Sequence, residues 1–216
     1  MPLQHRLIKR LFDFVASAIG LALLWPVIVI CMIIARRDTG LSGIFSQSRV
    51  GQYGKMIKVH KIRTMRRVEG VNTSVTVVND IRITPAGRKL RRLKLDELPQ
   101  LWNVFIGDMS FVGPRPDVPG YADSLKGEER FILELRPGIT GPATIKYTDE
   151  EMLLSRFADA KAYNDAVVYP DKVRLNLAYL REWSLMGDLR YILITLHLLS
   201  KPEELDTTRL LDGDKA

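Results

Sequence analysis

The sequence has little cysteine and little histidine, and these shortages exclude several kinds of site. Cys31 is the only cysteine among 216 residues and lies in an apolar run, so the chain has no disulfide framework and no thiol-rich metal cluster. The three histidines, His5, His60 and His197, are scattered without metal-ligand spacing. The sequence therefore does not indicate a zinc site or a histidine-based catalytic triad.

Acidic residues are also in deficit. Lys and Arg outnumber Asp and Glu by 32 to 25, which gives a formal net charge of +7. Such a chain is attracted to polyanions, and nucleic acid, anionic lipid headgroups and phosphorylated substrates all fit. Its 216 residues, 46% of them apolar, are enough to fold as one domain with a core and an appended element.

Charge is nearly absent between Leu11 and Ala35, where Asp13 is the only charged residue in 25. A straight helix of this length would reach about 37 Å, and a membrane hydrocarbon core is about 30 Å thick. Pro26 lies inside the run and should break or kink the helix. The flanks are basic on both sides, with Arg6, Lys9 and Arg10 before the run and Arg36 and Arg37 after it. Because basic flanks favour the cytoplasmic side, we expect a re-entrant hairpin broken at Pro26 rather than a single kinked span.

The rest of the chain predicts an α+β fold that is mostly helical with short strands. Residues 56–65 alternate apolar and basic residues as a half-buried strand does, whereas residues 85–105 have a helical pattern interrupted by Pro99. Further helices are expected at 126–135 and 173–186, and the apolar stretch at 191–199 is typical of a core or membrane-interface helix. We therefore divide the chain into a membrane-anchoring hairpin (1–37), a small cytoplasmic catalytic domain with interfacial helices (38–202) and a polar tail (203–216).

A basic window followed by two carboxylates carries the strongest chemical signal. In phosphoryl transfer, cations and a divalent metal neutralise phosphate oxygens while a carboxylate attacks phosphorus or holds the metal. A solvated helix face with ordinary ion pairs would explain the same residues, and their pattern leaves both interpretations open. The window contains Arg88, Lys89, Arg91, Arg92 and Lys94, and the carboxylates are Asp96 and Glu97.

Adjacent residues on a helix point about 100° apart. Asp96 and Glu97 can therefore face one site only if the backbone leaves the regular helix there, or if a helix begins there. Pro99 favours a helix start near Leu98.

Other cations could join these carboxylates. Arg115 stands between two prolines, which restrict its backbone and lower the entropic cost of ordering its side chain on a phosphate. Lys61 and Arg63, on the extended segment, could reach the same pocket. Each of these three side chains could equally form an ion pair with a carboxylate that only holds a loop in place.

Together with the proline-interrupted apolar run, seven sequence blocks resemble the monotopic phosphoglycosyl transferases, also called bacterial sugar transferases. The resemblance runs from Lys9 to about Leu199, and the order of the blocks makes it specific. The blocks are Lys9 to Asp13, Arg49 to Gly51, Lys61 to Met65, Asp80 to Thr84, Leu95 to Val104, Gly107 to Pro116 and Arg136 to Gly141.

The resemblance implies an enzyme on the cytoplasmic face of the bacterial inner membrane that uses Mg²⁺. Asp96 would attack the β-phosphate of a UDP-sugar, release UMP and carry a covalent phospho-sugar, which polyprenyl phosphate then removes. Glu97 would help bind the metal and position phosphates. The implied partners are the UDP-sugar, polyprenyl phosphate and membrane lipids, without nucleic acid. A second copy of the chain and downstream glycosyltransferases are further candidates.

The chain departs from the family pattern after Gly141. Many relatives have a Trp-Ala-Gln stretch and an Asn-Gly-Arg element there, whereas this chain has Pro142-Ala143-Thr144 and Lys146-Tyr147-Thr148. The substrate can therefore differ if that element touches the sugar or the phosphates. The competing hypothesis is a membrane-tethered protein that binds nucleic acid or anionic lipid through the basic window without turnover.

Overall fold

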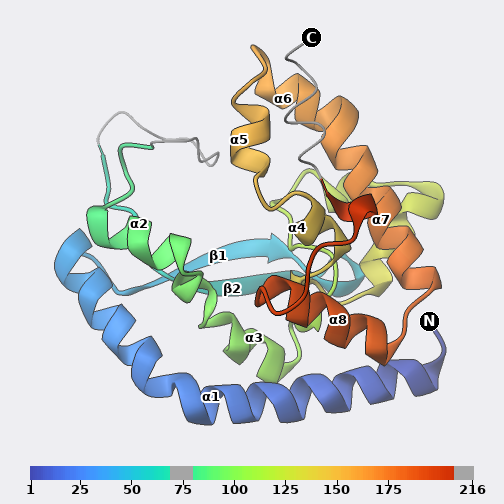
Figure 1. Ribbon diagram of the computed structural model, residues 1–216, viewed down its shortest axis with the longest axis horizontal. Coiled ribbons are helices and arrows are strands. Elements are labelled where there is room, and N and C mark those ends of the chain that lie inside the picture. Colours follow the sequence, from blue (N-terminus) through green and yellow to red (C-terminus); the bar gives the residue numbers. More distant parts are fainter. Residues whose placement is uncertain (69–79, 207–216) are drawn as a thin grey trace.

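The computed structural model describes residues 1–68 and 80–206 and confirms a mostly helical chain with a few short strands (Figure 1). One long helix, α1 (Leu3–Thr39), runs along one side of the domain formed by all later elements. The last ten residues of the predicted polar tail lie outside the described residues, while its first part forms a short turn, η6 (Glu203–Leu205), with Leu205 buried against the domain.

Helix α1 is continuous through Pro26, so the two separate helices expected for the hairpin are not present. Proline removes one backbone hydrogen bond, and a bend relieves the clash of its ring, so the flanking turns can remain helical. The ribbon of α1 is indeed bent part-way along (Figure 1). By length and composition the helix could cross a membrane, and only 11% of its most apolar window is buried.

Both halves of α1 are fixed to the same domain. Near the start of the helix, the Lys9 ammonium donates to the Asp188 carboxylate at 2.6 Å. Near its end, Cys31 and Ala35 pack against Ile62 and Leu90. The helix therefore follows the domain along its length.

Two small sheets form the strand part of the fold. Strands β1 (Ile44–Val50) and β2 (Met56–Ile62) are antiparallel and joined by the tight turn η1 (Gln52–Gly54). Strands β3 (Ser110–Val112) and β4 (Gly138–Thr140) are parallel. The predicted strand at 56–65 is confirmed, although it ends at Ile62.

Short helices surround these sheets. The predicted helical region at 85–105 is divided around Pro99 as expected. The helix expected at 126–135 is present over residues 127–134, but as a 3₁₀ helix. The helical elements are α2 (Pro85–Arg92), η2 (Leu95–Glu97), α3 (Gln100–Ile106), η3 (Ala122–Ser124), η4 (Gly127–Glu134), α4 (Pro142–Lys146), α5 (Glu150–Leu154), α6 (Ala160–Tyr163), the π-helical η5 (Asn164–Val168), α7 (Tyr169–Arg181) and α8 (Leu185–Thr195).

Candidate active site

The two adjacent carboxylates lie in a tight turn between two helices. Lys94, two residues after the end of α2, adopts the left-handed conformation at φ 54° and turns the chain. The single 3₁₀ turn η2 follows and carries Asp96 and Glu97. Pro99 directly precedes α3. The predicted departure from regular helix at this pair is confirmed, and both residues line one cleft.

A buried amide brings strand β2 to this turn. Asn103, on α3, accepts a hydrogen bond from the His60 N–H at 3.1 Å and donates to the Lys58 carbonyl at 2.7 Å. Its side chain is fully buried, so these backbone groups have their partners without water. The amide thereby fixes β2 against α3 and places Lys61 beside the carboxylates.

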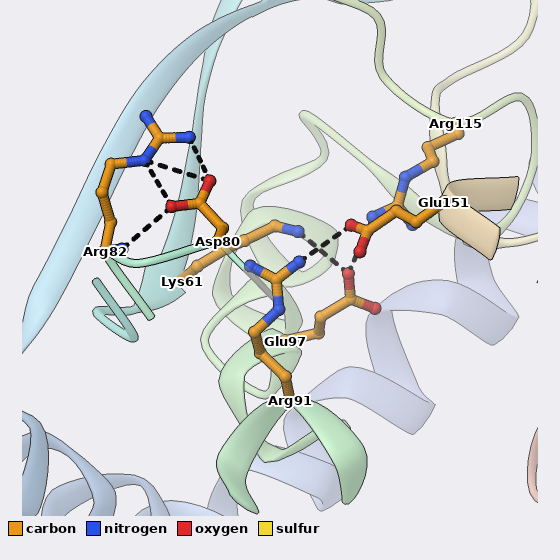
Figure 2. A network of polar contacts seen from close by, with 7 residues as sticks. All are labelled: Lys61, Asp80, Arg82, Arg91, Glu97, Arg115 and Glu151. Atoms are coloured by element: carbon orange, nitrogen blue, oxygen red, sulfur yellow. Dashed lines mark hydrogen bonds and ion pairs between the residues drawn. The ribbon is translucent and has the colours of Figure 1, made fainter. Parts of the chain in front are cut away.

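Glu97 is held by two cations. Its Oε1 atom accepts from Lys61 Nζ at 2.9 Å and from Arg115 Nη2 at 3.0 Å (Figure 2). Burial by itself would raise the pKa of Glu97, but the charges and hydrogen bonds of Arg115 and Lys61 outweigh it and lower this pKa to about 2. Glu97 is therefore ionised throughout the neutral range.

Arg115 reaches Glu97 because two sequence blocks approach each other backbone to backbone. A Cβ atom added to Gly113 would lie 2.3 Å from the Arg136 carbonyl oxygen, and one on Gly138 would lie 2.2 Å from the Gly113 nitrogen. A Cβ on Gly141 would lie 2.5 Å from the Gly113 carbonyl oxygen. Only glycine fits such contacts, which fix the segment that carries Arg115.

Asp96 differs from its neighbour. Among the described residues, no side chain forms a hydrogen bond or ion pair with its carboxylate. Burial, and then the charge of Glu97, raise the pKa of Asp96, while Lys61 and Arg91 act in the opposite direction. The turn thus presents to the same cleft one carboxylate that two cations neutralise and one without a side-chain partner.

The other two predicted cations are placed differently. Arg91, on α2, forms an ion pair with Glu151 of α5 at 3.0 Å (Figure 2). Arg63 also lines the cleft, but its guanidinium donates to the Ser42 carbonyl at 2.7 Å and lies over the Phe45 ring. The structure therefore joins Lys61 and Arg115 to Glu97, pairs Arg91 with Glu151, and holds Arg63 on the backbone carbonyls of Ser42 and Ile44.

The cleft has a volume of about 1,810 Å³. Ordinary small-molecule pockets measure about 300–1,000 Å³, so this one has room for more than one substrate. Sequence reasoning missed Asp117 in its lining, although this residue directly follows Pro116. Burial raises the pKa of Asp117 to about 6, with Lys172 and the Tyr169 hydroxyl opposing the shift.

The anchorage of α1 was also missed, because its partners are far apart in the sequence. Asp188 accepts from Lys9, from the Tyr179 hydroxyl at 2.6 Å and from the Trp183 indole N–H at 3.0 Å. Asp188 is completely buried. No local pattern in the sequence marks it as the partner of a lysine near the amino terminus.

Comparisons with known proteins agree with the family resemblance of the sequence blocks. A family model described as bacterial sugar transferase matches residues 4–201. The chain is 36% identical over 198 residues to the UDP-glucose:undecaprenyl-phosphate glucose-1-phosphate transferase of Escherichia coli (strain K12), covering 89% of this chain and 40% of that protein. It is 32% identical over 208 residues to the galactosyl transferase CpsE of Streptococcus agalactiae, covering 91% of this chain and 43% of CpsE.

A relative of similar length is the "Uncharacterized sugar transferase EpsL" of Bacillus subtilis (strain 168). The two chains are 30% identical over 209 residues, which cover 97% of this chain and 95% of that protein. By contrast, this chain spans about two fifths of the length of the Escherichia coli and Streptococcus relatives.

Proposed function

Because the chain belongs to the bacterial sugar transferase family, we propose that it transfers a sugar-1-phosphate from a UDP-sugar to polyprenyl phosphate. Such a reaction would begin the assembly of a lipid-linked glycan. It exchanges one phosphoanhydride for another, so catalysis consists mainly of positioning and charge stabilisation.

The observation that carries this proposal is the unequal environment of the two carboxylates. Glu97 is neutralised by Lys61 and Arg115, whereas Asp96 has no side-chain partner among the described residues and faces the same cleft. A carboxylate held by two cations is a poor nucleophile, while a free one with a raised pKa is a better nucleophile. We therefore assign the attack to Asp96.

The reaction has two steps on one phosphorus atom. An Asp96 oxygen forms a bond to the β-phosphorus of the UDP-sugar, and the bond from that phosphorus to the bridging oxygen breaks, so UMP leaves. A phosphate oxygen of polyprenyl phosphate then attacks the same phosphorus and displaces Asp96. Lys61, Arg91 and Arg115 line the cleft and would stabilise the phosphate oxygens, and Arg63 would join them by leaving its carbonyl partners.

The carboxylate pair also fits Mg²⁺. No group of three metal-binding side chains occurs in the part of the chain that the structure describes. Mg²⁺ is usually bound by one or two carboxylates with substrate phosphates and water. Asp96 is free, and both bonds to Glu97 use Oε1, so Asp96 and the Oε2 atom of Glu97 would hold the ion. When bound, it would neutralise charge on the phosphates.

The membrane role rests on α1. Between Leu7 and Ile34 its exposed residues are all apolar, yet both halves of the helix are fixed to one domain. A helix held in this way cannot pass its end to the other side of a bilayer without leaving the domain. We therefore propose that α1 enters one leaflet and returns, with its basic ends at the cytoplasmic face of the bacterial inner membrane. The most exposed large apolar residues of the helix are Leu3, Leu7, Leu11, Ile19, Leu23, Trp25 and Ile30.

The activity is tested by UMP release in detergent with Mg²⁺, polyprenyl phosphate and a panel of UDP-sugars. We expect the wild type to release UMP from at least one sugar nucleotide and Asp96→Asn to release none. Asp38→Asn, an exposed position outside the cleft, is the charge-matched control and should remain active. Ordinary activity of Asp96→Asn, or salt-sensitive nucleic-acid binding that Asp96→Asn leaves unchanged, would contradict the proposal.

The topology is tested by labelling single cysteines in intact cells. The buried Cys31 is replaced by alanine, and Gln4→Cys or Asp38→Cys is added at either end of α1. Protection of both positions from an impermeant thiol reagent is the expected result. Labelling of either one from outside would indicate a span.

A further inference from the structure

Two buried polar atoms on one wall of the cleft have no partner. They are Thr144 Oγ1, on α4, and Asn176 Oδ1, on α7. Both residues line the cleft, and α4 packs against α7. Asn176 is only 5% exposed, so a partner must enter through the cleft. A buried polar atom without a partner destabilises the fold, and such an atom in a cleft is typical of a ligand contact.

The surroundings of these two atoms favour a neutral ligand group over a charged one. The neighbouring hydroxyls of Thr140 and Thr195 are hydrogen-bonded to each other at 2.5 Å. The nearby ammonium of Lys172 is paired with Glu150 at 2.6 Å. Thr144 and Asn176 thus offer two hydrogen-bonding atoms beside a cation that is already paired, which suits a neutral hydroxyl or amide.

We propose that Thr144 and Asn176 form the subsite that binds the sugar of the donor, an inference that rests on the proposed function. The phosphates belong at the charged end of the cleft, with Lys61, Arg115 and the carboxylate pair. A hexose presents several hydroxyl donors around its ring, whereas uracil presents a single N–H and the ribose of the nucleotide two hydroxyls. Two unpartnered oxygens therefore match the sugar better than the base. The sugar that satisfies both oxygens is selected over one that lacks the facing hydroxyl or amide.

The test uses variants that remove each group without changing its size. Thr144→Val and Asn176→Leu remove the hydrogen-bonding atoms, and Thr144→Ser retains the hydroxyl as the matched control. For each protein, kcat/KM is measured over UDP-hexoses that differ at single hydroxyl or acetamido groups, together with inhibition by UDP. The same proteins are titrated with UDP-sugar and with UDP, so that binding is measured independently of UMP release.

We expect Thr144→Val and Asn176→Leu to lower affinity and kcat/KM for the preferred sugar about tenfold and to flatten the selectivity. Thr144→Ser should stay close to the wild type, and UDP binding should change less than about twofold in all variants. Because the atoms removed have no partner in the protein, Thr144→Val should also keep or raise the unfolding temperature.

Unchanged selectivity in both variants would overturn the subsite. An equal loss of UDP binding would also overturn it, because the wall would then hold the nucleoside. Absence of UMP release by the wild type would overturn the proposed function instead, since the titrations would still measure the subsite.

Discussion

The anchor of α1, formed by Lys9 and Asp188, and the turn η2, which carries Asp96 and Glu97, are both built on a carboxylate with several donors, but they differ in burial. Asp188 in the anchor is 0% exposed and takes three donors, so its oxygens have no access to solvent or ligand. The side chain of Glu97, on η2, is 19% exposed, and those of its partners Lys61 and Arg115 are 28% and 49% exposed.

This difference separates structural charge from functional charge. A buried and fully bonded carboxylate can only hold elements together, because no ligand reaches it. A half-buried cluster on a cleft can exchange its internal bonds for bonds to a phosphate. Variants in the two regions should therefore fail in different assays.

The largest expected effect is on stability, at the anchor. Asp188→Ala leaves the buried Lys9 ammonium without its counter-ion and should lower the free energy of unfolding by about 3–5 kcal/mol. Denaturation in detergent measures this loss, and Lys9→Met added to the variant should recover part of it. A stable Asp188→Ala protein without activity would erase the distinction between the two regions.

The second effect is on catalysis, at Glu97. Glu97→Gln keeps the size of the side chain but removes the charge shared by Lys61 and Arg115, so UMP release should fall about 100-fold. The stability loss should be smaller than for Asp188→Ala, because the two cations are partly solvated. UMP release and denaturation in detergent are both measured for this variant. If its main effect were a loss of stability, Glu97 would belong with the structural charges.

A smaller effect is expected at Arg115. Arg115→Lys keeps the positive charge but loses the planar fork that can hold Glu97 and a phosphate together, so kcat/KM should fall about tenfold. Steady-state kinetics with a UDP-sugar measures this change. Arg130→Lys, on the outer surface at η4, is the matched control. Equal kcat/KM for Arg115→Lys and the wild type would mean that charge alone matters at this position.

The smallest effect concerns pH. Burial raises the pKa of Asp117 to about 6, so the cleft gains a negative charge as the pH rises through 6. The KM for an anionic UDP-sugar should therefore rise about threefold between pH 5 and 7.5. Asp117→Asn should flatten this dependence of KM on pH. An identical profile in the variant would mean that the charge of Asp117 does not affect substrate binding.

The sequence predicted the elements that depend on local signals. Pro99 indicated that Asp96 and Glu97 leave the regular helix, and alternation in the 56–65 segment indicated β2. The sequence also predicted a broken helix at Pro26, but the structure has a continuous bent helix there. The prediction was wrong because the strength of a proline kink depends on what packs around it.

The remaining features depend on contacts between distant residues. Arg63 lies beyond the last residue of β2, so strand alternation did not fix its direction, and it bonds backbone carbonyls instead of facing Glu97. Asp188 and Asn176 follow no motif, since their importance comes from burial and from which partners they have or lack. Composition and spacing do not contain that information.

The central claim, that the free carboxylate of Asp96 is the nucleophile, is tested most directly by mass spectrometry of the intact protein. The wild type is incubated with its UDP-sugar and Mg²⁺ without the lipid acceptor, then digested to map the modification. We predict a mass increase of one sugar phosphate on the peptide that contains Asp96, absent from Asp96→Asn and removed by polyprenyl phosphate. An adduct on another residue, or turnover without any adduct, would contradict the account.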